Sequence, residues 1–157
     1  MITRRISATA IFCLALGLIA CETEDPGPVQ KFEKEFYDVD FERIEVASAL
    51  DVHVEQSNIY SITVSGDRRN IDDLQIYKSG NTLVLKFDDN PNRIHDTKIE
   101  ITMPRLEGAN FSAACSSTIN GFESDEDLDL FVAGASVCQV NAGYREVNLS
   151  LSGASNR

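Results

Sequence analysis

A short run of small residues recurs three times in the last third of the chain. Residues 111–116 align with residues 131–136 at an offset of 20, and residues 131–136 align with residues 150–155 at an offset of 19. Residues 120–122 resemble residues 141–144 in the same way. A unit of about 20 residues cannot bury its apolar face alone, so neighbouring copies must stack in register. The repeat therefore predicts stacked coils of β-structure.

Small residues occupy the same corner of each copy. Gly and Ala at a recurring corner allow a tight bend and a close approach between successive backbones. The alignment also places three serines above one another as a ladder at one edge, namely Ser116, Ser136 and Ser155. The alternative fold is a β-sandwich in which the similarity of these Ala and Ser runs is coincidental.

The chain before the repeat alternates apolar and polar residues with a period of two. Such spacing of β-branched residues predicts half-buried strands, which we place at residues 44–46, 50–55, 62–65, 74–76, 83–87 and 99–103. Residues 68–73 fit one helical turn, and Lys78-Ser79-Gly80-Asn81 is a hairpin signal. Because no longer segment has helical periodicity, the sequence predicts an all-β domain.

Residues 1–20 have the features of a signal peptide. Arg4 and Arg5 precede an apolar stretch that is shorter than the roughly 20 residues of a membrane-spanning helix. The stretch ends in Leu18-Ile19-Ala20-Cys21, which resembles a bacterial lipobox. We expect cleavage before Cys21 and acylation of its thiol and of the new amino terminus. An ordinary signal peptide followed by a chance cysteine is the alternative.

Residues 21–40 are expected to form an acidic tether, since they begin with an acidic run and contain Pro26-Gly27-Pro28. Removal of the signal peptide leaves 12 basic and 25 acidic side chains, a net charge of −13. We therefore expect the membrane to hold the protein through N-terminal acyl chains, and we expect no nucleic-acid partner. Glu22 gives no indication of inner-membrane retention. The acidic residues 21–25 resemble the signal that sends some lipoproteins to the outer face of the outer membrane.

Two cysteines remain after the signal peptide and the lipidation site are set aside. Cys115 and Cys138 lie in what would be an oxidising compartment, where a disulfide is possible. The repeat alignment does not stack them directly, which favours two small, half-buried apolar side chains. A zinc site is not supported, because neither cysteine belongs to a Cys-x-x-Cys motif and no His lies near them in the sequence.

Several weak motifs follow one another in a recognisable order. They are Phe41–Val46 leading into Leu50–Gln56, Val64–Asp67 before a polar turn, Asn81–Leu85 after a Gly, Ile99–Leu106 before the repeats, and Leu151–Ser155 at a corner. In this order, over residues 41–157, the chain resembles the putative auto-transporter adhesin head GIN domain family of bacterial exported proteins. The final motif is similar to that family's repeated Ser-Gly-Ala-Ser corner.

The resemblance implies a right-handed parallel β-helix-like solenoid with a strand-rich N-terminal part. It also implies an exported or surface protein, and it brings no catalytic motif. Members usually carry more coils beyond this point, whereas this sequence stops at Arg157, just past a corner. An open coil exposes unpaired backbone and apolar side chains. We therefore expect that the domain is truncated, or else that another chain covers this end.

Carboxylates cluster in two stretches, namely Asp88 and Asp89, and the set Asp125, Glu126, Asp127 and Asp129. Oxygen ligands suit Ca²⁺, but the spacing matches no known calcium loop or calcium-binding repeat. We expect solvated acidic loops at both places. His53 on a polar strand face and His95 in a loop are likewise expected to be solvated. We expect neither a metal nor a cofactor.

These observations favour a non-catalytic, lipid-anchored β-solenoid domain of the cell envelope. It would present a flat, polar face rich in Ser and Asp to a protein or glycan, as an outer-membrane lipoprotein facing the periplasm or the cell surface. The first alternative is a carbohydrate-active enzyme on a β-helix scaffold that uses Asp127, Asp129 and Arg145. No catalytic spacing supports it, and so acidic a domain repels polyanionic substrates. The second alternative is an envelope spacer or stress-signalling component.

Overall fold

Nearly all of the described chain is β-strand. The computed structural model describes residues 27–36, 40–88 and 95–153. Within them lie ten strands and one short helix: β1 (Lys31–Phe36), β2 (Arg43–Val46), β3 (Asp51–Gln56), β4 (Ser61–Asp67), α1 (Arg68–Asp72), β5 (Leu74–Ser79), β6 (Thr82–Phe87), β7 (Thr97–Met103), β8 (Gly108–Phe111), β9 (Ser116–Gly134) and β10 (Val137–Gly153). The all-β prediction is confirmed, as are the single helical turn and the β5–β6 hairpin. In this part of the chain no helix has the length and apolar character needed to cross a membrane.

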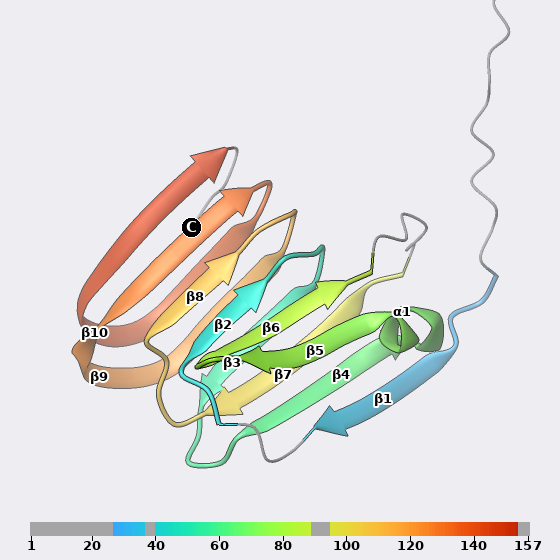
Figure 1. The fold of residues 1–157 in the computed structure, drawn as a ribbon, viewed down its shortest axis with the longest axis horizontal. Coiled ribbons are helices and arrows are strands. Elements are labelled where there is room, and N and C mark those ends of the chain that lie inside the picture. The colour runs from blue at the N-terminus through green and yellow to red at the C-terminus, as the bar shows by residue number, and fades with distance from the viewer. Residues whose placement is uncertain (1–26, 37–39, 89–94, 154–157) are drawn as a thin grey trace, which may run out of the picture.

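The strands form one sheet that curls into an open half-barrel (Figure 1). Its order is β1-β4-β7-β3-β9-β8-β2-β6-β5, and β10 pairs with β9. The long strand β9 folds the sheet back on itself, because its first residues pair with β3 and its last with β8. We call β1, β4, β7, β3 and the first halves of β9 and β10 the β3 wall. The β2 wall consists of β5, β6, β2, β8 and the second halves of β9 and β10.

Strands that follow one another along each wall are mostly parallel. In the β3 wall β3 pairs in parallel with β7 and β9, and in the β2 wall β2 pairs in parallel with β6 and β8. The antiparallel pairs are β1 with β4, β4 with β7, and β5 with β6. A parallel pair needs a crossover between its strands. Here each crossover passes through the opposite wall, by one strand or by several, so the chain returns to each wall repeatedly as it advances.

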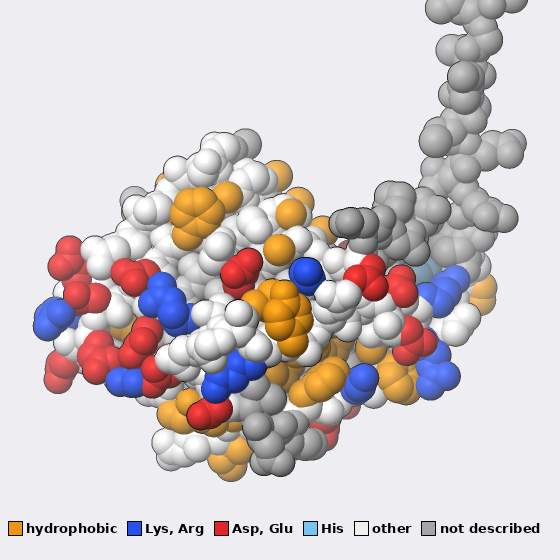
Figure 2. All heavy atoms as spheres, viewed as in Figure 1, with side chains coloured by type: hydrophobic (Ala, Val, Ile, Leu, Met, Phe, Trp, Pro, Cys, Tyr) orange, Lys and Arg blue, Asp and Glu red, His pale blue; other side chains and the backbone are white. Residues whose placement is uncertain are grey.

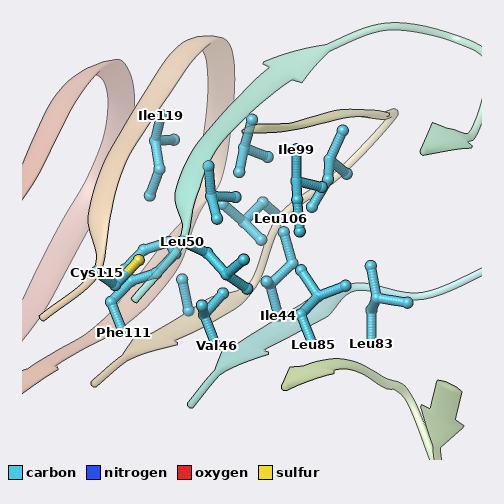
Figure 3. Close-up of a cluster of buried hydrophobic side chains, with 14 of the residues drawn as sticks. Ile44, Val46, Leu50, Leu83, Leu85, Ile99, Leu106, Phe111, Cys115 and Ile119 are labelled. Atoms are coloured by element: carbon cyan, nitrogen blue, oxygen red, sulfur yellow. The ribbon is translucent and has the colours of Figure 1, made fainter. Parts of the chain in front are cut away.

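The apolar core fills the space between the two walls. Alternate residues of each strand point inward, so that Val52 and Val54 of β3 face Ile44 and Val46 of β2 with almost no exposed surface. Figure 3 shows buried side chains from both walls meeting in this space, among them Leu83, Leu85, Ile99 and Ile119. Burial of this apolar surface is the main stabilising contribution to the fold.

The repeat stacks in parallel, but its first offset differs from the predicted one. Phe111 pairs with Val132, an offset of 21 where the alignment predicted 20, and Asn120 pairs with Asn141. Two register shifts at the bend of β10 then reduce the offset, so that Gly134 pairs with Gly153 at the predicted 19. The predicted first offset of 20 is therefore wrong by one residue, because matching Phe111 with Phe131 by residue type sets an inward residue against an outward one.

The slip of one residue also removes the predicted serine ladder. Ser116 pairs with Val137, while Ser136 is buried and its Oγ accepts a hydrogen bond of 3.2 Å from the backbone N–H of Cys115. A shift of one residue in a strand exchanges the two faces of the sheet. The prediction is thus wrong for the first two serines, and Ser155 lies outside the described residues.

The stacked corners share a left-handed backbone. Ala113, Gly134 and Gly153 have φ values of 63°, 71° and 79°. A Cβ atom on Gly134 would approach the backbone nitrogen of Ala113 to 3.3 Å, so successive corners lie in close contact. The prediction of a tight corner made by small residues is confirmed. In the first corner Ala113 and its neighbour Ala114, with a φ of 66°, bear side chains in this strained region, which costs free energy for an L-residue.

We expect Ala113→Gly to stabilise the protein by about 0.5–1 kcal/mol. The change removes the strain of a Cβ at positive φ, and part of this gain is offset by the greater freedom of Gly in the unfolded chain. Urea unfolding of the full chain measures the difference. The matched control is Ala133→Gly, within β9 at ordinary φ, which should lose a similar amount. A lower urea midpoint for Ala113→Gly than for the unchanged chain would contradict the strained corner.

Part of the expected tether belongs to the sheet. Lys31–Phe36 form β1, which pairs antiparallel with β4 along its whole length. Phe32 and Phe36 pack against the core, and Arg68 lies over the Phe32 ring at 4.4 Å. The composition of residues 21–40 is that of a linker, but these two aromatic residues on one strand face hold it to the domain. The predicted signal peptide and Cys21 lie outside the described residues.

Candidate functional site

The outer face of the β2 wall carries a groove of about 400 Å³. It crosses five neighbouring strands, in the spatial order β6, β2, β8, β9 and β10. The side chains that give it chemical character are Arg43, Glu45, Asn110, Asp129, Phe131 and Asn148. The groove faces away from the core, because these residues alternate with the buried positions of the same strands. The lining of the groove is mostly polar, with one aromatic residue among the polar ones.

Strand pairing arranges the groove residues in two rows that run across the wall. The first row is Thr82, Arg43, Gly108, Asp129 and Asn148. The second row is Glu45, Asn110, Phe131 and Ser150, and it continues to Val84 of β6, which is buried and does not line the groove. Neighbouring strands lie about 4.8 Å apart, so each row spans about 19 Å. The parallel register thus places residues from distant parts of the chain side by side.

Gly108 makes the first row possible. A Cβ atom there would clash with Nη2 of Arg43, so the missing side chain leaves room for the guanidinium to lie across β8. Arg43 then reaches Asp129, donating from Nη1 and Nη2 to Oδ2 at 3.3 and 3.2 Å. Asn148 donates from Nδ2 to Oδ1 of the same carboxylate at 3.3 Å. The positive charge of Arg43 and the negative charge of Asp129 therefore balance at the centre of the groove, and hydrogen bonds hold these two side chains and Asn148 together.

The second row places the exposed aromatic ring of Phe131 beside Asn110, whose side-chain amide has an unsatisfied oxygen. Phe131 has 40% of its surface exposed and pairs across the sheet with Asn110. Oδ1 of Asn110 is buried without a hydrogen-bond partner in the described part of the chain. An unpaired buried acceptor costs about 1–3 kcal/mol. A donor placed in the groove would recover this free energy once the amide turned toward it.

The predicted acidic cluster lies within strand β9, not in a loop, and much of it is paired with arginines. Arg105 bridges Glu42, Glu107 and Glu126. Figure 2 shows acidic and basic side chains intermixed at the end of the molecule where β9 and β10 bend. Among residues 27–36, 40–88 and 95–153, no three His, Cys, Asp or Glu side chains are placed to hold a metal ion. Asp88 is exposed, and Asp89 lies outside the described residues.

The three residues considered for an enzymatic role form two separate ion pairs. Arg145 donates from Nε and Nη2 to Asp127 at 2.9 Å each, whereas Asp129 pairs with Arg43. The hydrogen bonds from Arg145 hold the pKa of Asp127 below its ordinary value. A glycosidase needs one carboxyl group that retains its proton near the working pH. Asp127, in its ion pair with Arg145, is therefore poorly suited to be such an acid.

The two histidines lie in different surroundings. His53 is 40% exposed on the outer face of the β3 wall, with Nε2 at 3.4 Å from Asp51, as expected for a solvated residue. His95 is less exposed than predicted. Its Nε2 is buried without a hydrogen-bond partner in the described chain and lies 3.9 Å from the carboxylate of Asp67. The residues around it come from α1 and β4, and their proximity cannot be read from the sequence around position 95.

Cys115 and Cys138 are free and buried in the structure. They do not stack on one another, since Cys138 pairs with Ser117 and Cys115 contacts Ser136. Burial raises the pKa of the Cys115 thiol to about 12 and raises that of Cys138 as well. Both thiols are therefore protonated near neutral pH and are poor nucleophiles, as befits side chains that fill the core.

Asp129 was predicted from the sequence as a candidate site residue, whereas the other residues of the groove were not. Outward positions could have been read from period-two alternation, which places Asp129 and Phe131 between the apolar Leu128, Leu130 and Val132. Nothing in the alternation shows that β2 pairs with β8 and β8 with β9. Arg43 and Asp129 are 86 residues apart in the chain, so their contact depends on that strand order.

The family model described as putative auto-transporter adhesin, head GIN domain, matches residues 40–157. Among proteins with curated descriptions, none matches the chain.

Solved structures with a similar fold include proteins from Bacteroides fragilis and Parabacteroides distasonis. A putative adhesin from Bacteroides fragilis has a TM-score of 0.71 at 19% identity, over 80% of this chain and 60% of that one. A putative adhesin from Parabacteroides distasonis has a TM-score of 0.69 at 15% identity, over 82% and 56%. A putative lipid-binding protein from the same species has a TM-score of 0.54 at 17% identity, over 77% and 61%. This chain thus spans about three-fifths of their length, and the likeness establishes a common fold.

Proposed function

This chain belongs to the family of the putative auto-transporter adhesin, head GIN domain, and on that premise we propose that it is a non-catalytic binding module of the bacterial cell envelope. The observation that carries the proposal is the outward groove on the β2 wall, where polar side chains and one aromatic residue are held by strand pairing. The names of the two putative adhesins with a similar fold agree with such a role. The partner is a glycan or a glycosylated protein.

The scaffold of this module is a β-solenoid. The parallel pairings within each wall and the stacking of β10 on β9 support it, since each coil adds one strand to either wall. Such coils give a rigid outer face on which side chains recur at fixed spacing. A rigid face suits adhesion, because little conformational entropy is lost when a partner is bound.

Retention on a glycosylated surface tests the proposed function. Beads that carry the full mature chain should be held on immobilised mucin under flow, while beads that carry serum albumin should pass. The same protein is incubated with a panel of polysaccharides, and products are separated by chromatography. Absence of retention would refute the binding role, and release of oligosaccharides from any polymer would refute the non-catalytic one.

We further propose that acyl chains on Cys21 hold the module in the outer membrane, at the periplasmic or the cell-surface face. The lipobox-like sequence Leu18–Cys21 supports this anchor, and residues 22–30 would separate it from β1. The acidic domain would stand away from anionic lipid because of charge repulsion. The acyl anchor would then be at the N-terminus of the mature chain, and the binding groove would be on the folded domain that follows it.

Replacing Cys21 with Ser should abolish acylation and leave the precursor uncut before residue 21. The hydroxyl is a much weaker nucleophile than the thiol, so no diacylglycerol is transferred. Intact mass measurement of membrane-extracted protein reads both effects. The matched control is Cys13→Ser within the signal peptide, which should still be cleaved and acylated. A Cys21→Ser protein that is processed and fractionates with membranes would show that the anchor lies elsewhere.

A further inference from the structure

We propose that the groove on the β2 wall binds a neutral oligosaccharide that lies across the strands, with one sugar ring stacked on Phe131. This inference rests on the proposed binding role and names its ligand class and its site. It combines three features of the groove, namely its hydrogen-bonding groups, its aromatic ring and its charge.

The hydrogen-bonding groups match the hydroxyls of a sugar. Asp129 accepts three hydrogen bonds from Arg43 and Asn148, although a carboxylate has about four acceptor sites. The amide of Asn110 adds a donor group and the unsatisfied Oδ1. A terminal amide turns readily about its last torsion, which would direct Oδ1 into the groove that the residue lines. Hydroxyls both donate and accept, so one sugar can satisfy these different groups at once.

The aromatic ring gives the groove one apolar contact beside the polar ones. Phe131 lies between Asn110 and Ser150 in the second row, and a large part of its ring is exposed. Binding sites for small ligands combine apolar contact with a few placed polar groups. A pyranose ring has this dual character, with C–H groups on its faces and hydroxyls on its rim. A ligand of hydroxyls alone would leave the ring of Phe131 unused.

The charges of the groove favour a neutral ligand over an anionic one. Arg43 is paired with Asp129, which leaves the carboxylate of Glu45 as the second acidic group of the groove. The whole chain has a formal net charge of −11. A polyanionic glycan would therefore be repelled over a long range as well as in the groove.

The position of the groove disfavours an extended peptide. Peptides that bind to sheets add a strand at a free edge, where backbone groups are unpaired. One end of the groove reaches the edge strand β10, but its middle lies over β2, β8 and β9, each of which has a partner on both sides. Its span of about 19 Å across the strands suits a chain of about four sugar rings at a repeat of about 5 Å, close to the strand spacing.

NMR titration of the ¹⁵N-labelled full mature chain in detergent micelles tests the inference. Cellotriose, maltotriose and tri-N-acetylchitotriose serve as neutral probes, and trigalacturonic acid serves as the anionic probe. At least one neutral probe should shift the amide signals of Asn110, Phe131, Asn148 and Ser150. Phe131→Ala and Asn148→Ala should each weaken that binding by about tenfold. The control His53→Ala, which removes an exposed ring from the opposite wall, should leave it unchanged.

Three results would overturn the inference. They are the absence of shifts with every neutral probe, shifts confined to the β3 wall, and equal or tighter binding of trigalacturonic acid. Retention on mucin distinguishes failure of the inference about the groove from failure of the proposed binding function. If Phe131→Ala beads are held as firmly as those with the unchanged chain, the module binds through another surface. If the unchanged chain is not retained at all, the binding role itself is refuted.

Discussion

Replacing Phe111 with Ala is expected to lower the free energy of unfolding by about 3–5 kcal/mol. The Phe111 ring has no exposed surface and lies in the core between the walls (Figure 3). The substitution removes apolar contacts and leaves a cavity that the curled sheet can close only in part. Because a domain of this size is stable by about 5–15 kcal/mol, the loss is a large share of the total. Urea unfolding followed by far-ultraviolet circular dichroism measures it.

Phe131→Ala is the matched control, since sequence similarity aligns the two phenylalanines. Phe131 lies on the outer face of the β2 wall, and its removal should cost less than about 1 kcal/mol. The two changes delete the same atoms from the same residue type, so burial alone separates them. Equal losses for the two variants would contradict the one-residue register difference between the first and second copies.

Phe111 and Phe131 show what the sequence could predict about the repeat and what it could not. The recurrence of small residues correctly predicted that the chain stacks on itself in parallel. The matching of Phe111 with Phe131, however, relied on residue type and not on the alternation around each residue. Leu128, Leu130 and Val132 alternate as buried positions, which places Phe131 on the opposite face. An alignment of alternation patterns would therefore have required an odd offset, as observed, and excluded 20.

Local features were predicted well because their causes are local. The hairpin between β5 and β6 follows from Gly80, whose positive φ suits the turn. The helical turn α1 follows the end of β4 and buries Ile71, as the spacing of apolar residues indicated. Strand β1 was missed because Phe32 and Phe36 lie in a segment with the composition of a linker. Their packing depends on β4 and on Arg68, which follow much later in the chain.

The groove could not be predicted from the sequence, because strand order creates it. Each of its strands alternates normally, and nothing in β2 indicates that Arg43 will lie over Gly108. The sequence does contain the needed small residue, but Gly108 has an ordinary backbone conformation. Its role is to make room for a side chain that comes from a distant strand. Prediction of such a site requires the pairing partners first.

The buried carboxylate of Asp67, at the junction of β4 and α1, was also not predicted from the sequence. Asp67 is 1% exposed and caps the helix by accepting a hydrogen bond from the backbone N–H of Arg69. It also accepts the backbone N–H of Gln30 and two hydrogen bonds from the Arg69 guanidinium, at 2.8 and 2.6 Å. One side chain thus connects the segment before β1, the end of β4 and the start of α1. Its substitution should have the largest effect after that of Phe111.

The hydrogen bonds from Arg69 hold the pKa of Asp67 well below its ordinary value of 3.8. Since the folded pKa lies below the unfolded one, the native state binds fewer protons than the unfolded chain. The stabilisation is therefore fully present above about pH 5 and is lost progressively as the pH falls through 3.8 toward the folded pKa. Protonation of Asp67 would remove the negative charge of the carboxylate that faces the guanidinium of Arg69.

Asp67→Asn should lower the thermal midpoint by several degrees at pH 7, because the amide cannot accept all four hydrogen bonds. Its deficit relative to the unchanged chain should shrink as the pH falls from 5 to 2.5, because Asp67 then becomes protonated in the unfolded chain while it stays ionised in the folded one, which lowers the stability of the unchanged chain. Asp72→Asn, which makes the same charge change at an exposed position of α1, should show neither effect. Thermal melts of the three full chains at half-unit pH intervals provide the comparison. A deficit that stays constant down to pH 2.5 would mean that Asp67 contributes through its shape and hydrogen bonds, and that its ionisation does not stabilise this junction.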